Sequence, residues 1–267
     1  MKQTRQLNQS QLDLLHILYR FRFATRSLLS GYFQKPNNTS LYSKVTILEK
    51  HGYIGSRYDK SYKLAGREAE YYITPKGVRA LREADVTDIT DYDISASYKD
   101  KTVSEQYVQQ IILLFAFRNL LVTTHPELRY FTARDIQNLD YFPKKKPTAF
   151  LSLKIGDETK RFFLEYIPAQ TSTGSIKGKL RHYSQYFDED AWGVTETDFP
   201  AILFVAEDGM TEQGVRWHIK REQFKADTDI RYFTTTKKAL LSTAQAGGNI
   251  WTDMEDKDDL MTLDTLT

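Results

Sequence analysis

The sequence contains no cysteine among its 267 residues. This absence excludes disulfide bonds, thiolate metal sites and a cysteine nucleophile, and it is typical of a reducing cytosol, so we expect a cytoplasmic protein. Long apolar runs are also missing, because the longest, Ile111 to Phe117, is far below the roughly 18 residues that span a bilayer. The first residues, MKQTRQLNQSQ, lack the apolar core of a signal peptide. We therefore predict no membrane partner.

Signatures of common enzyme chemistry are missing as well. The five histidines show neither HxxxH nor HxH spacing, which argues against a histidine-based metal site. The sequence contains no GxxxxGK[ST], no GxGxxG and no GxSxG, so phosphate-binding loops of nucleotide enzymes and serine-hydrolase elbows are not indicated. We expect no cofactor.

Charge is distributed unevenly along the chain, although the net charge is only +2. Residues 1–82 hold 15 Lys and Arg against 5 Asp and Glu, whereas the remainder holds 22 against 30. A basic module on a mildly acidic body indicates that one end of the protein meets a polyanion. A generally solvated surface is the alternative explanation.

The length is enough for about two domains, since a domain takes roughly 100–200 residues. We predict a first domain at 1–84, a linker at 85–101, a second domain at 102–245 and an acidic tail at 246–267. The linker prediction rests on the turn formers in DVTDITDYDISASYKD, which carries few large aliphatic residues. The tail prediction rests on six acids against one lysine in GGNIWTDMEDKDDLMTLDTLT.

The first segment predicts three helices followed by a basic hairpin. The stretches NQSQLDLLHILYRFRF, ATRSLLSGYF and NTSLYSKVTILEKHGYI give the helices, with Thr25 as N-cap of the second. In the third, Leu41, Val45 and Leu48 recur at helical spacing and should face the core. Two short strands, YIGSRY and EAEYYIT, then flank a loop rich in positive charge, and Pro75 starts a further helix.

This order of elements resembles a winged helix-turn-helix DNA-binding domain. The resemblance implies a recognition helix that fits the roughly 12 Å major groove and a wing that touches phosphates. Positions matching the outward face of a recognition helix are Tyr42, Ser43, Lys44 and Thr46. Positions matching phosphate contacts are Lys50, Arg57, Lys60, Lys63 and Arg67. Two alternatives stay open: a winged helix used for protein contacts, and a Tyr42 that packs against the first helix.

The second domain reads as an α-β-β-β-α-β-α-β series, which predicts a mixed sheet with helices on its faces. Its central hairpin, TAFLSLKI and KRFFLEYI, fixes a register if Gly156-Asp157 is a two-residue turn. Thr148 then lies opposite Glu165. One face of the hairpin suits a core: Ala149, Leu151, Leu153, Ile155, Phe162 and Leu164. The other face is mixed: Thr148, Phe150, Ser152, Lys154, Arg161, Phe163, Glu165 and Ile167.

This arrangement resembles the restriction-endonuclease-like PD-(D/E)xK nuclease fold, so the chain is expected to be a two-domain α+β or α/β protein. With the winged helix ahead of it, the whole chain resembles the replication-relaxation family of plasmids and mobile elements. The nuclease pattern has an Asp after the hairpin Pro, where this chain has Thr148. It has an acid on the second strand, where Glu165 survives, and then a Lys, where this chain has Ile167. The resemblance implies that Lys179 in the next helix replaces that lysine.

The loss of carboxylates has a direct chemical meaning. Mg²⁺ requires several oxygen ligands, commonly carboxylates and water, and it must activate water for phosphodiester cleavage. Glu165 beside a threonine and an isoleucine supplies too little negative charge, so we expect no metal ligands and no catalytic residues. Substitute acids remain an alternative, as does a structural pairing of Glu165 with Lys179 or Arg161. The candidate substitutes are Glu105, Asp135, Asp140 and Glu158.

Two further patterns remain ambiguous. The loop FPKKKPTAF places three lysines between prolines and either tracks a phosphate backbone or is simply solvated. A relaxase-type tyrosine nucleophile near the site, Tyr166, Tyr183 or Tyr186, is a weaker alternative to packing.

The leading functional hypothesis is a non-enzymatic protein that binds double-stranded DNA and acts as an accessory factor in replication, relaxation or conjugative mobilisation of a plasmid or mobile element. The resemblance implies a relaxase or other relaxosome or replication proteins as partners, and a homodimer stays open. One alternative is a divergent metal-dependent relaxase or nuclease that nicks DNA. Another is a transcriptional regulator with a dimerising C-terminal domain, whose interface the helix QYVQQIILLFAF would supply.

Overall fold

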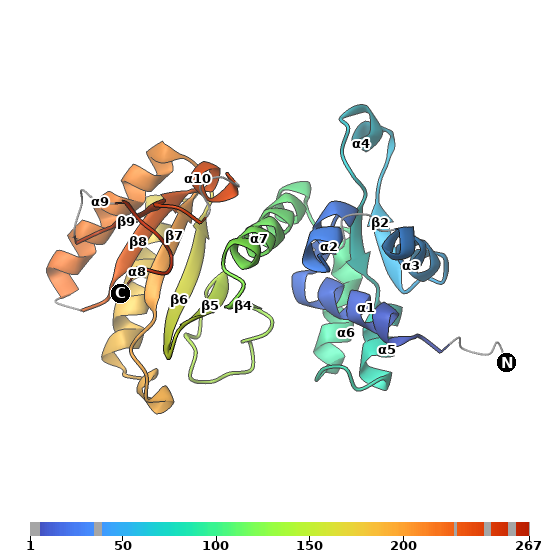
Figure 1. The fold of residues 1–267 in the computed structure, drawn as a ribbon, viewed down its shortest axis with the longest axis horizontal. Helices are drawn as coiled ribbons and strands as arrows, with labels where there is room; N and C mark the ends of the chain where they lie inside the picture. The colour runs from blue at the N-terminus through green and yellow to red at the C-terminus, as the bar shows by residue number, and fades with distance from the viewer. Residues whose placement is uncertain (1–5, 35–38, 227–228, 243–246, 256–259, 267) are drawn as a thin grey trace. The chain divides into compact units, whose positions relative to one another are not determined.

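The computed structural model describes residues 6–34, 39–226, 229–242, 247–255 and 260–266. It divides into two compact units, Met1–Asn119 and Leu120–Thr267, here called the N-terminal and C-terminal units. The helix α7 (Glu105–Thr124) begins in the first unit and ends in the second (Figure 1). The boundary therefore lies well after the one that the sequence suggests.

The N-terminal unit contains the predicted helices and hairpin in the predicted order. Its first elements are α1 (Gln9–Phe21), β1 (Phe23–Ala24), α2 (Arg26–Tyr32) and α3 (Thr39–Lys50). They are followed by β2 (Ile54–Arg57), α4 (Lys60–Leu64), β3 (Glu70–Ile73) and α5 (Pro75–Glu83). The strands form an antiparallel sheet in the order β1-β3-β2. The short helix α4 lies at the far end of the connection between β2 and β3 (Figure 1), and we call this connection with its two strands the wing.

Local sequence signals explain where these helices begin. Thr25 accepts a hydrogen bond from the amide of Leu28 at the start of α2, as its N-cap position predicts. Pro75 occupies the first turn of α5, where its missing N–H costs no hydrogen bond. In α3 the three residues predicted to face the core are buried: Leu41, Val45 and Leu48.

The prediction of a linker at 85–101 is wrong, because this stretch is folded onto the N-terminal unit. It forms α6 (Asp91–Ser97) and the 3-10 helix η1 (Tyr98–Lys101). Its polar residues act as caps and anchors: Thr90 and Asp93 form a capping box, and buried Asp100 accepts a hydrogen bond from Arg22 at 3.2 Å. The turn formers of this stretch therefore begin and fix short helices.

Helix α7 supplies apolar residues that complete the N-terminal unit. Phe115 stacks on Phe21 with ring centroids 4.1 Å apart, and Val108 packs against Phe23 and Tyr72. Within the described residues, α7 is the one helix with the length and composition to cross a membrane, and core helices pass the same test. The buried residues of α7 pack against other residues of the protein, and the N-terminal unit therefore extends to Asn119.

The C-terminal unit is a mixed α+β fold built on a seven-stranded sheet in the order β10-β9-β8-β7-β6-β5-β4. Strands β6, β7 and β8 are parallel, and the remaining neighbours are antiparallel. The predicted α-β-β-β-α-β-α-β order is confirmed as α7-β4-β5-β6-α8-β7-α9-β8. Its central elements are β4 (Leu128–Thr132), β5 (Ala149–Ile155), β6 (Glu158–Ile167), α8 (Thr173–Asp188) and β7 (Ala201–Ala206). The later ones are α9 (Gly209–Ala226), β8 (Tyr232–Thr236), α10 (Lys237–Leu241), β9 (Trp251–Asp253) and β10 (Leu260–Met261).

The expected acidic tail at 246–267 instead adds two strands to the sheet edge. Trp251 on β9 is fully buried, and Asp253 pairs with Arg231 at 2.5 Å. The excess of acids therefore does not predict an unstructured tail here, since at least one of these acids is a buried ion-pair partner. Residues 256–259, which hold several of the remaining acids, lie outside the described part of the chain.

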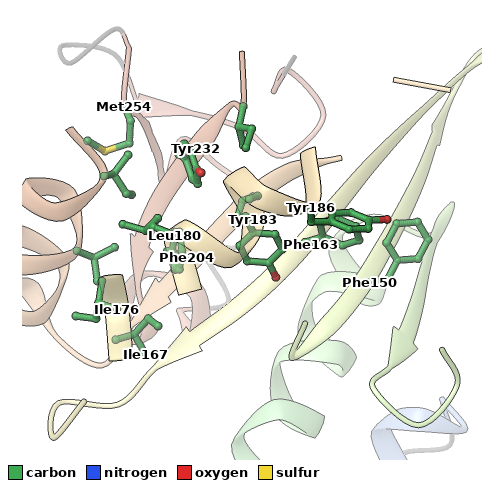
Figure 2. Close-up of a cluster of buried hydrophobic side chains, with 14 of the residues drawn as sticks. Phe150, Phe163, Ile167, Ile176, Leu180, Tyr183, Tyr186, Phe204, Tyr232 and Met254 are labelled. Carbon is green, nitrogen blue, oxygen red and sulfur yellow. The ribbon is translucent and has the colours of Figure 1, made fainter. Parts of the chain in front are cut away.

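The predicted hairpin register is confirmed. Ile155 pairs with Glu158 across the turn, and Gly156 has a φ of +59°, which glycine adopts at no steric cost. The face expected to suit a core is mostly buried, and the other face is mixed as expected, with Phe150, Phe163 and Ile167 buried and Lys154 exposed. Phe150, Phe163 and Ile167 join the aromatic core beneath α8 (Figure 2). Thr148 and Glu165 lie on the same face as these residues, and their site is described next.

Candidate functional site

The outward face of α3 is a stripe of small polar and basic side chains. Ser43, Thr46 and Lys50 are exposed and recur at i, i+3 and i+7, so they lie on one side of the helix. They lie opposite the buried apolar stripe of α3. This side can enter a groove without removing apolar contacts from the core.

Two residues predicted for the same face lie at its flanks. Lys44 is half-buried beside the apolar stripe. Tyr42 is 53% exposed, and its ring lies under the guanidinium of Arg26 on α2, 4.5 Å from the ring centroid. Its recorded ring partner is thus on the second helix rather than the first. Arg26, which the sequence did not single out, also has a buried Nε without a recorded hydrogen-bond partner in the described structure.

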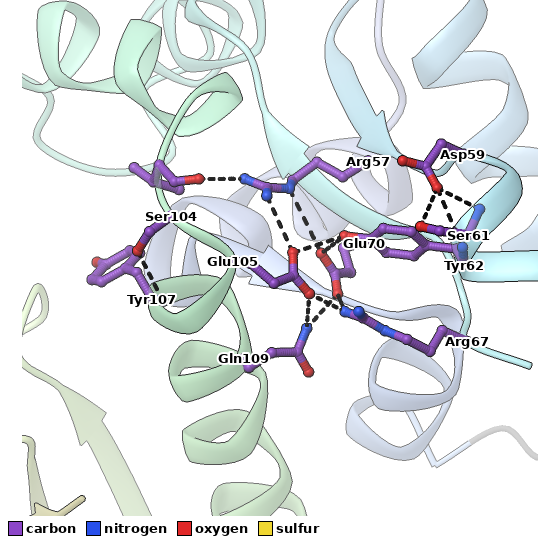
Figure 3. Close-up of polar contacts among 11 residues, drawn as sticks. Arg57, Asp59, Ser61, Tyr62, Arg67, Glu70, Ser104, Glu105, Tyr107 and Gln109 are labelled. Carbon is purple, nitrogen blue, oxygen red and sulfur yellow. Dashed lines mark hydrogen bonds and ion pairs between the residues drawn. The ribbon is translucent and has the colours of Figure 1, made fainter. Parts of the chain in front are cut away.

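The four basic residues predicted for the wing divide into two pairs. Lys60 and Lys63 lie exposed on α4, at the far end of the wing. Arg57 and Arg67 lie nearer its base and form ion pairs with two carboxylates, Glu70 on β3 and Glu105 on α7 (Figure 3). The expected phosphate contacts of Arg57 and Arg67 would have to compete with these pairs.

This ion-pair cluster, made of Arg57, Tyr62, Arg67, Glu70 and Glu105, is closely connected. Glu70 is only 2% exposed, and Arg67 bonds one of its oxygens at 2.6 Å while the Tyr62 hydroxyl lies 2.9 Å from the other. Glu105 also contacts Arg57 at 3.2 Å and the Tyr62 hydroxyl at 3.0 Å. Two carboxylates thus balance two guanidinium groups, and the base of the wing is close to electroneutral.

The cluster also perturbs its own titration. Burial and the neighbouring carboxylates of Glu70 and Glu105 raise the pKa of Tyr62 to about 12. Partial burial alone would raise the pKa of Glu105, but hydrogen bonds from Arg67 and Tyr62 outweigh it and lower that pKa. Glu105 therefore stays ionised near neutral pH and keeps the start of α7 bonded to the wing.

We expect Glu70→Ala to lower the free energy of unfolding of the N-terminal unit by about 2 kcal/mol. Removing one partner of a buried pair costs more than the pair contributes, and the exposure of Arg67 reduces this cost. All three tryptophans lie at or beyond residue 192, in the C-terminal unit. Far-UV circular dichroism should therefore show an earlier transition while tryptophan fluorescence does not. Glu68→Ala, at an exposed position two residues away, should change neither.

The site that the nuclease resemblance predicts, here called the remnant centre, surrounds Glu165 on β6, which is 2% exposed. Thr148 donates a hydrogen bond to its Oε2 at 3.0 Å, and Lys179 on α8 contacts the same oxygen at 2.8 Å. Tyr183 donates to Oε1 at 2.8 Å. The predicted pairing of Glu165 with Lys179 is confirmed, whereas Arg161 donates to the carbonyl of Thr159 instead.

The other two features of the nuclease pattern are absent here. Ile167 is fully buried in the apolar core, so its position offers no cation to a substrate. Thr148 uses its hydroxyl to bond Glu165 and accepts from the amide of Tyr166 at 3.3 Å. The centre is thus one buried carboxylate with all of its recorded partners acting as donors.

The lysine loop, residues 142–147, lies beside this centre. Lys146 is structural, because its Nζ donates to the carbonyls of Leu139 at 2.8 Å and Phe142 at 3.5 Å. The amide of Lys145 donates to Nε2 of His182 on α8 at 3.3 Å, which assigns the proton of a neutral imidazole to Nδ1. Burial lowers the pKa of His182, and the charges of Lys145 and Lys179 act in the same direction. His182 therefore anchors the loop in its neutral form.

The acids considered as substitute metal ligands make other contacts. Asp135 accepts from the amide and hydroxyl of Thr132, Glu158 begins β6 at the turn, and Glu105 belongs to the ion-pair cluster. Asp140 acts electrostatically on Lys146. Across the described residues, no group of three or more His, Cys, Asp or Glu is arranged to hold a metal ion.

The three candidate tyrosines are poor nucleophiles near neutral pH. Burial, above all, raises the pKa of Tyr166, Tyr183 and Tyr186. Tyr166 also bonds Glu207, Tyr183 bonds Glu165, and Tyr186 bonds the carbonyl of Tyr141. Each hydroxyl therefore has a structural partner.

Comparison with known proteins places this arrangement in context. The sequence profile of the replication-relaxation family matches residues 15–202. No curated protein matches the chain. Among solved structures, the restriction endonuclease FokI matches with 8% identity and a TM-score of 0.31, covering 87% of this chain and 43% of the endonuclease. FokI bound to DNA matches with 9% identity and a TM-score of 0.28, with the same 87% and 43% coverage. The chain thus spans less than half the length of that enzyme, and the topology above, rather than these low scores, defines the fold.

Proposed function

Because the chain belongs to the replication-relaxation family, we propose that it is a DNA-binding accessory protein of a plasmid or other mobile element. In this role the N-terminal unit acts as a winged helix-turn-helix that binds duplex DNA. A relaxase or another replication protein would be its partner in the cytoplasm. The described residues of the C-terminal unit include no group of three or more metal-binding side chains, and this unit serves as a second contact surface.

The observation that carries this proposal is the polar stripe of α3 together with the free end of the wing. Ser43 and Thr46 offer hydroxyl groups to base edges, and Lys50 offers an ammonium group to a phosphate. Lys60 and Lys63 extend the basic surface along the wing. The ion pairs of Arg57 and Arg67 make these two arginines supports of the wing rather than the first contacts with DNA.

A salt titration tests the proposal. If Lys44, Lys50, Lys60 and Lys63 each neutralise one phosphate, the logarithm of the binding constant should fall with a slope of about −4 or steeper against the logarithm of salt concentration. Fluorescence anisotropy of a labelled duplex measures this slope. A slope near zero, or no binding at low salt, would contradict the proposal and favour a winged helix that contacts protein.

The position of the bound site then separates the possible roles. A footprint at an origin of transfer or replication supports the accessory role, and a footprint at a promoter supports a transcriptional regulator. Because Glu165 is present, a divergent nuclease is the competing function. Incubating the protein with supercoiled plasmid and Mg²⁺ or Mn²⁺ and measuring nicking tests it. Nicking that Glu165→Ala abolishes would establish an enzyme instead.

A further inference from the structure

The remnant centre carries a charge opposite to that of a working metal site. Glu165 contributes one negative charge, and Lys179 cancels it at 2.8 Å. The adjoining lysine loop adds the ammonium groups of Lys144 and Lys145, while His182 stays neutral because its pKa is lowered. A divalent cation would therefore meet net positive charge here, whereas an anion would be attracted.

The ammonium group of Lys179 has spare donor capacity. It carries three N–H bonds, and Glu165 occupies one direction of approach. Its side chain is 36% exposed, whereas that of Glu165 is 3% exposed. The carboxylate thus lies on the inner side of the lysine and fixes its position, and the outer side of the ammonium group faces solvent.

The lysine loop presents its two exposed lysines from a fixed backbone. The amide of Lys145 is bonded to His182, and Phe142 is buried in the aromatic core beside Trp192 and Phe163. Lys146 closes the loop through its two carbonyl contacts. In the described structure, no ion pair or hydrogen bond is recorded for the ammonium groups of Lys144 and Lys145. Their charges are therefore available to a ligand at little cost in backbone order.

We propose that the remnant centre is a metal-independent phosphate-binding site that takes a phosphodiester of the DNA backbone through Lys144, Lys145 and Lys179. Glu165 is a positioning residue in this site, because it holds Lys179 and does not itself contact the phosphate. The proposal rests on the proposed function, since it assigns the same DNA a second contact on the C-terminal unit. It also gives these two positions of the nuclease pattern a role: Lys179 neutralises the charge of Glu165, and Thr148 donates a hydrogen bond to it, so that an anion can approach.

The first test compares the affinity of the full chain for duplex DNA with that of Lys144→Ala/Lys145→Ala, in EDTA. Alanine keeps the amide of residue 145, so the bond to His182 survives and the loop stays in place. We expect roughly 50-fold weaker binding at about 0.1 M salt and a salt slope shallower by about 2, as loss of two phosphate contacts requires. Lys154→Ala/Lys238→Ala removes the same charge from exposed positions on β5 and α10 and should stay within about twofold of the unmodified chain.

The second test uses Glu165→Gln, for which a phosphate site and a metal site predict opposite changes in the affinity for DNA. Glutamine keeps an oxygen for Lys179 and removes the negative charge, so phosphate binding should tighten about fivefold. A metal-dependent site would lose affinity with this change, and its binding would also be lost in EDTA. Either loss overturns the proposal.

The two proposals fail in different ways. If the lysine-loop variant binds like the unmodified chain while Ser43→Glu with Lys50→Glu on α3 abolishes binding, the phosphate site is refuted and DNA binding by the N-terminal unit stands. If neither set of changes alters binding, both proposals are refuted. If only the lysine-loop variant weakens binding, the phosphate site stands and the proposed role of α3 is refuted.

Discussion

Placing glutamate at both Ser43 and Lys50 should weaken binding to duplex DNA about 500-fold at about 0.1 M salt. The change removes one ammonium group and adds two carboxylates on the outward stripe of α3, which equals the loss of about three phosphate contacts. Both positions are exposed and lie outside the buried stripe of the helix, so the fold should be retained. Fluorescence anisotropy measures the affinity, and far-UV circular dichroism checks the fold.

A matched variant separates local contact from overall charge. Ser95→Glu with Lys99→Glu makes the same chemical changes at exposed positions of α6 and η1. Helix α6 packs with α5 and η1 packs with α6 and β3, whereas α3 packs with β2. We expect this variant to weaken binding by no more than about threefold, through long-range charge alone. Equal losses in both variants would show that α3 holds no special position and that the N-terminal unit binds only through net charge.

Gly77→Ala should lower the free energy of unfolding of the N-terminal unit by about 3 kcal/mol, the largest stability effect that we expect. A Cβ at this position in α5 would lie 2.2 Å from the carbonyl oxygen of Tyr53 and 2.7 Å from Cγ1 of Ile73. The carbonyl cannot move away easily, because it accepts hydrogen bonds from both the amide and the hydroxyl of Thr74, the N-cap of α5. Helix α5 would have to shift as a whole.

The measurement follows the two units separately. Circular dichroism should show early loss of the N-terminal unit in urea, while the tryptophan fluorescence of the C-terminal unit keeps its midpoint. Gly178→Ala on α8 is the contrasting control, because its Cβ would meet nothing within 4 Å. There the gain in helix propensity should stabilise the C-terminal unit by about 0.5–1 kcal/mol. A Gly77→Ala midpoint equal to that of the unmodified chain would contradict the close approach of α5 to Tyr53.

Local sequence patterns were sufficient for the central hairpin. A Gly-Asp turn with a positive φ and alternating apolar residues determine the pairing, so the sequence alone predicts that Thr148 lies beside Glu165. The pairing of Glu165 with Lys179 also follows from a short separation, because α8 directly succeeds β6 in the chain.

Contacts between distant segments could not be predicted in the same way. Glu105 is separated from Arg57 and Arg67 by several elements, so no pattern in the sequence indicates that it neutralises them. The sequence therefore predicts four phosphate contacts from four positive charges on the wing, although two of these charges, those of Arg57 and Arg67, form ion pairs with carboxylates. The linker prediction failed for a related reason: Asp100 pairs with Arg22 and α6 packs with α5, and the sequence alone does not identify these partners.

The continuity of α7 has a practical consequence for dissecting the protein. A fragment that stops at residue 84 would deprive Arg57 and Arg67 of Glu105 and would uncover the ring of Phe21 where Phe115 stacks. Such a piece would keep Glu70 as the single carboxylate beside the two arginines and would carry one more net positive charge on its wing, which would strengthen its binding to any polyanion and exaggerate its affinity for DNA. A fragment that keeps the contacts of the N-terminal unit must therefore include the chain through Asn119.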